Sequence, residues 1–176
     1  IAYAKSLLRH PDGCRDEAVK SLAALSKARL DATRLTEDEL FDARQNARVI
    51  VSAEEYYRAM LTGDAESWNV RDRHMMETLN ILLKHHGPAS KGIVWAHNTH
   101  VGDYRATDML DGGYVNLGGL AREQLGPDQV ALVGFGTYEG EVTCGKAWGA
   151  PEEIVALPKA KAGSIEADFH RAGKET

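Results

Sequence analysis

The sequence has only two cysteines in 176 residues, Cys14 and Cys144, far apart along the chain. Two distant cysteines do not make a disulfide framework, so we expect a reducing compartment and predict a cytoplasmic protein. No apolar run approaches the roughly 20 residues that span a bilayer, and the first residues lack the basic and then apolar pattern of a signal peptide. These absences argue against a disulfide-stabilised secreted domain and against a membrane partner.

Basic residues are also not in excess. The 21 Lys and Arg residues are outnumbered by 26 Asp and Glu residues, which gives a net charge of −5. Because proteins that bind nucleic acid usually carry a clustered basic face, we expect no nucleic-acid partner. A hydrophobic content of 43% and a charged content of 27% are ordinary for globular proteins and exclude a disordered chain. The first residue is Ile1 rather than Met, and we expect the chain to be part of a longer protein.

Helical periodicity dominates the first half of the chain. Apolar residues recur at helical spacing over residues 15–30, from about 36 to 61 and from about 66 to 86. The segment Thr36-Glu37-Asp38-Glu39 has the form of a capping box, and Gly87-Pro88 is a stop signal. The sequence therefore predicts a helical segment over residues 1–90.

A different pattern begins at Gly92. Residues 93–96 and 130–135 are short apolar runs typical of buried strands, and a helix is predicted between them at 117–125. Strand, helix and strand in this order predict a βαβ unit and a parallel sheet. We therefore assign residues 91–176 to the βαβ part of an α/β core.

The end of the sequence contains weaker signals. Residues 134–143 alternate enough to continue a strand or to form a hairpin, and a surface loop is expected over 151–163. Ser164 has the position of an N-cap of a closing helix.

His97, Asn98 and His100 follow the first predicted strand. Ligands of open parallel sheets bind beyond the carboxyl ends of strands, so these side chains are candidates for a site. Histidine titrates near neutrality and can serve as a general base or a charge stabiliser. Two histidines three positions apart could also share a metal ion, although a third ligand at recognisable spacing is missing. A structural interpretation, in which one histidine caps the strand end and the other is solvated, stays equally open.

Arg71-Asp72-Arg73-His74 lies in the first turns of the third predicted helix. An adjacent Arg and Asp could hold a carboxylate or oxyanion and orient a histidine. The same residues could equally form the charged face of an amphipathic helix, with Asp72 stabilised near its N-terminus. Spacing alone favours the structural interpretation.

Three further polar side chains are candidates with structural alternatives. Glu139 could supply a carboxylate at the sheet edge or be a hairpin charge, whereas Ser164 and Glu166 are explained by capping and by the helix dipole. The sequence has no Gly-Xaa-Ser-Xaa-Gly elbow, so an ordinary serine hydrolase mechanism has no visible nucleophile. The stretch Gly134-Phe135-Gly136 is too short for a dinucleotide fingerprint, and no cofactor is predicted.

Taken together, three segments resemble the erythromycin esterase family, which includes proteins labelled as succinoglycan biosynthesis proteins. They are Arg71-Asp72-Arg73-His74-Met75-Met76, then Ile93-Val94-Trp95-Ala96-His97-Asn98-Thr99-His100-Val101-Gly102, then Gly163-Ser164-Ile165-Glu166. The resemblance covers about residues 43 to 171. It implies a three-layer α/β/α core with helices packed over the cleft. It also implies hydrolysis of a macrolactone ester by water activated through a histidine, and hence a role in macrolide antibiotic resistance.

The resemblance also implies roles for individual residues. His97 and His100 match the second histidine pair of the family, and Arg71 and Asp72 match its Arg-Asp motif. The motif commonly continues Met-Ala-Asp-Asn, where this chain has Met76-Glu77-Thr78. The other histidine of the family and its partner carboxylates belong to a segment that this chain does not contain, so we expect half of an active site and no activity from this chain alone.

The prediction is thus a carboxylic-ester hydrolase acting on a small-molecule ester, with no metal. The predicted catalytic residues are His97, His100 and Arg71, and the predicted substrate-binding residues are Asp72, Asn98, His74, Glu139, Ser164 and Glu166. Two alternatives stay open. One is a metal-dependent hydrolase of another substrate, and the other is a non-catalytic binding module on the same fold.

Overall fold

The computed structural model describes residues 2–29, 34–147 and 149–173. The chain divides into two compact units, Ile1–Val133 and Gly134–Thr176. The first unit is helical, and the second contains a small antiparallel sheet, so the described chain is a helix-rich α/β structure. The organisation into segments 1–90 and 91–176 stays a prediction.

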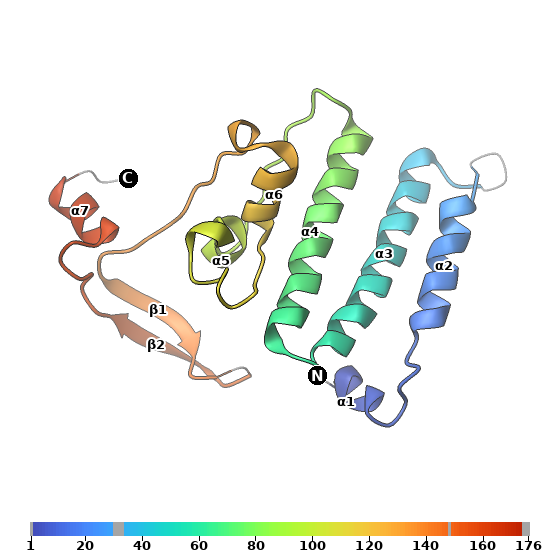
Figure 1. Cartoon of the computed structure of the whole chain (residues 1–176), viewed down its shortest axis with the longest axis horizontal. Helices are drawn as coiled ribbons and strands as arrows, with labels where there is room; N and C mark the ends of the chain where they lie inside the picture. Colours follow the sequence, from blue (N-terminus) through green and yellow to red (C-terminus); the bar gives the residue numbers. More distant parts are fainter. Residues whose placement is uncertain (1, 30–33, 148, 174–176) are drawn as a thin grey trace. The chain divides into compact units, whose positions relative to one another are not determined.

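The first unit is built of helices, and its longest helices lie side by side in a row. The helices are α1 (Ala2–Leu7), α2 (Arg15–Lys27), α3 (Glu37–Ala59), α4 (Asp64–His86), α5 (Asn98–Val101) and α6 (Leu117–Leu125), with short 3-10 turns η2 (Tyr104–Ala106) and η3 (Pro127–Gln129). In Figure 1, α2, α3 and α4 form the row, and α5 and α6 lie on the other side of α4 from α3.

The predicted long helices are confirmed, with small differences at their ends. The capping box of α3 is present: Thr36 Oγ1 accepts from Glu39 N at 3.2 Å, and a Glu39 carboxylate oxygen accepts from Thr36 N at 2.7 Å. Helix α4 begins two residues before the predicted start, and Gly87, with a φ of 90°, ends it. The predicted end of the first long helix, Leu30, lies outside the described residues.

A cluster of buried apolar side chains lies between α4 and α6. Met76 on α4 is buried together with Leu117, Leu120 and Ala121 on α6. Partly buried Met75, Leu79, Val115 and Val130 pack around this cluster. Apolar burial therefore holds the start of α6 against the middle of α4, close to Asp72.

The strands predicted over 93–96 and 130–135 are wrong for this structure. Both segments lack regular secondary structure. Most of their apolar side chains lie at the surface: Ile93 is 95% exposed and Val133 is 67% exposed, whereas Val130 is partly buried. A strand is stable only where a neighbour accepts and donates its backbone hydrogen bonds, and no strand pairs with either segment in the described chain. Consequently no βαβ unit, parallel sheet or three-layer α/β/α core is found among the described residues.

The sheet of the second unit is a hairpin. Strands β1 (Gly140–Gly145) and β2 (Glu152–Leu157) are antiparallel, with Gly140 opposite Leu157 and Gly145 opposite Glu152. The hairpin alternative for residues 134–143 agrees with β1, whereas the loop expected over 151–163 is wrong where β2 occupies it. Helix α7 (Ile165–Arg171) follows, and the predicted cap is confirmed because Ser164 Oγ accepts from Ala167 N at 3.2 Å.

Cys14 and Cys144 are both free thiols. None of the helices within the described residues is long and apolar enough to cross a bilayer.

Gly118 permits the close approach of α6 to the end of α5, because an added Cβ would overlap the carbonyl oxygens of Val101 and Gly102. We expect Gly118→Ala to lower the free energy of unfolding by about 1–3 kcal/mol, as overpacking typically does. Denaturant unfolding of the purified chain measures this. The control is Gly63→Ala, where an added Cβ meets nothing within 4 Å. Equal losses in the two variants would contradict the close-approach argument.

Candidate active site

A buried carboxylate, Asp72, joins three helices of the first unit. Its side chain is 0% exposed. His100 Nδ1 lies 2.9 Å from both carboxylate oxygens, and Leu117 N donates to Oδ1 at 3.0 Å. Helices α4, α5 and α6 therefore meet at this carboxylate.

The hydrogen bonds to Asp72 determine which nitrogen of His100 is available. An ionised carboxylate can only accept, so Nδ1 carries the proton and Nε2 presents its lone pair. Burial raises the pKa of the Asp72 carboxyl above its usual value, while the bonds from His100 and Leu117 and the charge of Arg71 oppose this rise. A raised pKa favours the protonated carboxyl, so the stability that Asp72 contributes through this shift is lost as the pH rises through that pKa.

The ring of His100 is stacked on Trp68. The ring centroids are 4.5 Å apart and the planes differ by 4°. The indole is itself fixed, because Trp68 Nε1 donates to the backbone oxygen of Val115 at 2.7 Å. The His100 side chain is 17% exposed, so the imidazole is held on two sides but still reaches the surface.

Arg71 completes the group. Its Nη2 lies 3.4 Å from His100 Nε2, and its guanidinium carbon lies 4.8 Å from the centroid of the Trp68 ring and 6.0 Å from that of Tyr56. Arg71 Nε is buried and has no hydrogen-bond partner among the described residues. We call Trp68, Arg71, Asp72 and His100 the Asp72 cluster.

The spacing of α4 explains this grouping. Arg71 and Asp72 follow Trp68 by three and four positions, so both lie on the same face of the helix as Trp68. Asn69, one residue after Trp68, donates to the oxygen of Gly113 at 2.8 Å and accepts from Val115 N at 2.8 Å. The side chain of Asn69 thus binds the backbone of the segment that leads into α6.

Asn116 connects α6 to the segment that carries His100. It is the N-cap of α6, with Oδ1 accepting from Gly119 N at 3.0 Å and from Tyr104 N at 3.2 Å. Its Nδ2 donates to the oxygen of Thr99 at 2.9 Å. Because Asn116 is buried and bonded on both ends of its amide, it fixes the backbone next to His100.

His97 has a local role at the start of α5. His97 is exposed and caps α5, since its Nδ1 accepts from Thr99 N at 3.3 Å and lies 3.0 Å from Thr99 Oγ1. Asn98 is an exposed residue of α5. The structure thus divides the predicted pair: His100 lies on a buried carboxylate, and His97 has a local capping contact.

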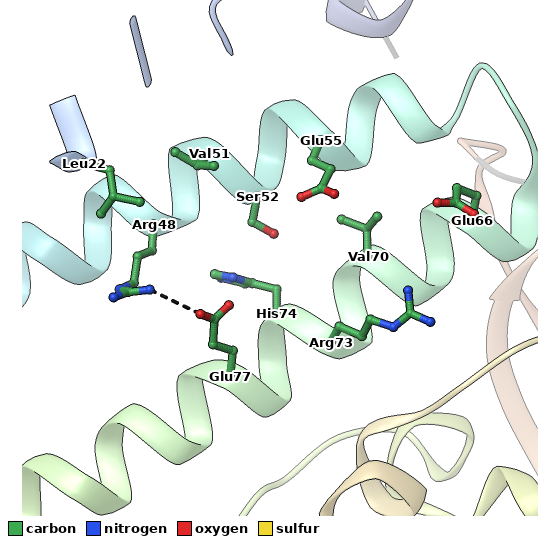
Figure 2. A pocket seen from close by; sticks show the side chains of 10 residues that line it. All are labelled: Leu22, Arg48, Val51, Ser52, Glu55, Glu66, Val70, Arg73, His74 and Glu77. Atoms are coloured by element: carbon green, nitrogen blue, oxygen red, sulfur yellow. Dashed lines mark hydrogen bonds and ion pairs between the residues drawn. The ribbon is translucent and has the colours of Figure 1, made fainter. Parts of the chain in front are cut away.

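His74 faces a different part of the molecule. It lines a groove of about 320 Å³ that also includes Ser52 and Glu55 on α3. Figure 2 shows His74 between the two helices, beside the ion pair of Arg48 and Glu77, whose closest atoms are 3.3 Å apart. The groove is therefore separate from the Asp72 cluster, and substrate binding by His74 stays a prediction.

The remaining predicted residues belong to the second unit and have local contacts there. Glu139 is paired with Lys159 at 3.7 Å, and Ser164 caps α7. Glu166 lies in the first turn of α7. Their predicted role in substrate binding stays a prediction.

The model of the erythromycin esterase family matches residues 1–176, the whole chain. The chain belongs to the erythromycin esterase family. This membership indicates a hydrolase of that family. No solved structure matches the chain. No group of three or more His, Cys, Asp or Glu side chains that could hold a metal ion is found in the part of this erythromycin esterase family chain that the structure describes.

Sequence reasoning did not single out Trp68, Asn69 or Asn116. Trp68 could have been found from the helical spacing to Arg71 and Asp72, which places all three on one face. Asn116 could have been recognised as an N-cap before the helix predicted at 117–125. The tertiary contacts of these residues carry no local sequence signal.

The two histidines are expected to be opposite tautomers when neutral. His100 should carry its proton on Nδ1, because Asp72 accepts there, whereas His97 should carry it on Nε2, because its Nδ1 accepts from Thr99 N. Long-range ¹H–¹⁵N correlation spectra of the purified chain distinguish these forms. Asp72→Asn should disturb the His100 pattern and leave that of His97 unchanged. A neutral His100 protonated on Nε2 would contradict the geometry.

Proposed function

We propose that this chain contributes an aspartate-oriented histidine base to a carboxylic-ester hydrolase that cleaves a macrolactone-type ester. The observation that carries the proposal is the bond between His100 Nδ1 and the buried Asp72 carboxylate, at 2.9 Å. A histidine held in one tautomer by a buried carboxylate is a recurring way to present Nε2 as a general base.

In the proposed reaction, water is the nucleophile. His100 Nε2 takes a proton from the water as its oxygen bonds to the ester carbonyl carbon. The bond to the leaving alkoxide then breaks, and the proton on Nε2 passes to that alkoxide, which leaves a carboxylic acid and an alcohol. Asp72 stays ionised and stabilises the imidazolium between the two steps.

The other predicted residues have supporting roles in this proposal. Arg71, with Nη2 3.4 Å from His100 Nε2, holds an anionic group or stabilises the developing oxyanion. His97 and Asn98 bind or orient the substrate or the water from the exposed surface of α5. No seryl intermediate is proposed.

Several wider predictions belong to the same proposal. A three-layer α/β/α core would bury apolar side chains that are now exposed, such as Ile93, Trp95 and Val133. Further catalytic groups would come from a segment that this chain does not contain, so activity is expected from the full-length protein. Macrolides as substrates, and a cytoplasmic location, are also part of the proposal and follow only from the resemblance and the composition.

Substitution of His100 tests the proposed base. In the full-length protein, we expect His100→Gln to lower kcat on a panel of esters by about 10²–10⁴, the range for loss of a general base. Arg71→Ala should lower the rate by about 10²–10³ if it stabilises oxyanion charge. His10→Ala, in an exposed loop, is the control histidine. Circular dichroism checks folding.

The outcomes separate the alternatives. A folded His100→Gln variant with near-normal hydrolysis would contradict the base assignment. Loss of activity on treatment with a chelator, restored by a metal, would favour the metal-dependent alternative. If the folded full-length protein hydrolyses no ester, the alternative of a non-catalytic binding module would be favoured.

A further inference from the structure

Arg71 is a half-buried arginine without a carboxylate partner among the described residues, in contrast to several other arginines of the chain. Ion pairs join Arg48 with Glu77, Arg58 with Glu54, Arg105 and Arg122 with Asp103, and Arg171 with Asp168. Arg71 is half-buried, and within the described residues no carboxylate oxygen lies within ion-pair distance of it. Because buried charges in proteins are usually paired, this cation has an unfilled requirement for an anion.

The neighbouring carboxylate cannot meet this requirement. Asp72 is fully buried and already accepts from His100 Nδ1 and Leu117 N. The two groups interact only through space: burial raises the pKa of Asp72, and the charge of Arg71 opposes this rise. The two aromatic rings near the guanidinium, Trp68 and Tyr56, offer π faces and no negative charge.

The orientation of the guanidinium shows where an anion would bind. Nε–H and Nη2–H lie on the same side of an arginine side chain and form the fork that takes two oxygens of a carboxylate or phosphate. In Arg71, Nε has no partner among the described residues, and Nη2 has only the 3.4 Å contact to His100 Nε2, which is long for a hydrogen bond. The fork thus points toward His100, the proposed base, and its two N–H groups lack a good hydrogen-bond acceptor.

We propose that Arg71 binds an anionic oxygen group, a carboxylate or phosphate, that the substrate carries, and that this binding releases His100 Nε2. In the free protein Nη2 covers the lone pair that the proposed base must use. An anion that occupies the fork draws Nη2 away, so the base is free only when such a substrate is present. The release step rests on the proposed function, whereas anion binding by Arg71 does not.

Titration of the chain with acetate and with inorganic phosphate, at constant ionic strength, tests anion binding directly. We expect saturable shifts of the Arg71 Nε–H resonance that move together with those of the His100 ring. Acetate alone would indicate a carboxylate on the substrate, and preferential binding of phosphate would indicate a phosphate. Either result supports the proposal. Shifts that stay linear in anion concentration, or that spare Arg71, would overturn it.

Arg71→Gln should weaken binding of the preferred anion by about tenfold or more, because a charged fork is replaced by a neutral amide. The matched control is Arg73→Gln, which makes the same change at an exposed position of α4 and should alter binding less than about twofold. Equal weakening in the two variants would overturn the assignment. If Arg71→Gln is unfolded, Arg71→Lys is used, which keeps the charge and removes the fork.

A pair of esters tests the substrate class in the full-length protein. One ester carries a free carboxylate, and the other carries the same group as a neutral amide. Arg71→Gln should raise KM for the anionic ester by about tenfold relative to the amide. Equal effects on both esters would overturn the inference while leaving His100 as the base. Conversely, an active His100→Gln variant would remove the proposed function and leave anion binding standing.

Discussion

The junction of α4, α5 and α6 depends on the burial of one carboxylate. Asp72 receives hydrogen bonds from α5 through His100 and from the start of α6 through Leu117 N, while Met76, one turn further along α4, packs against α6. Removing a bonded partner of a buried group costs about 1–3 kcal/mol for each donor left unpaired. The position of His100 is therefore a consequence of how three helices are joined.

The same carboxylate connects the fold to the proposed chemistry. A buried anion is costly unless it is paired, so the structure surrounds Asp72 with donors, and one of these donors is the imidazole that the reaction needs. Trp68 restricts the plane of that imidazole, and Arg71 occupies its remaining nitrogen. The arrangement orients the base and leaves one cation without a carboxylate, which is the basis of the proposed anion binding.

Local signals in the sequence were sufficient for the long helices, but not for the short helices α1 and α5. The capping box at Thr36 and the helix predicted at 117–125 are both present, because propensity and caps act within a few residues. Residues 93–96 were misassigned because an apolar run does not reveal whether a neighbouring strand is there to pair with it. The pairing of Asp72 with His100 depends on the docking of α6, which no spacing encodes. For the same reason, the capping role of His97 and the buried position of His100 could not be separated in advance.

A double-mutant cycle between Asp72 and His100 tests the central claim most directly. His100→Phe retains a ring that can stack on Trp68 and removes the Nδ1 donor, while Asp72→Asn removes the charge. The unfolding free energies of the chain, both single variants and the double variant give the interaction energy of the pair. We predict about 1.5–3 kcal/mol, the range for a hydrogen bond to a charged group. An interaction energy near zero would contradict the claim that Asp72 holds His100 in place.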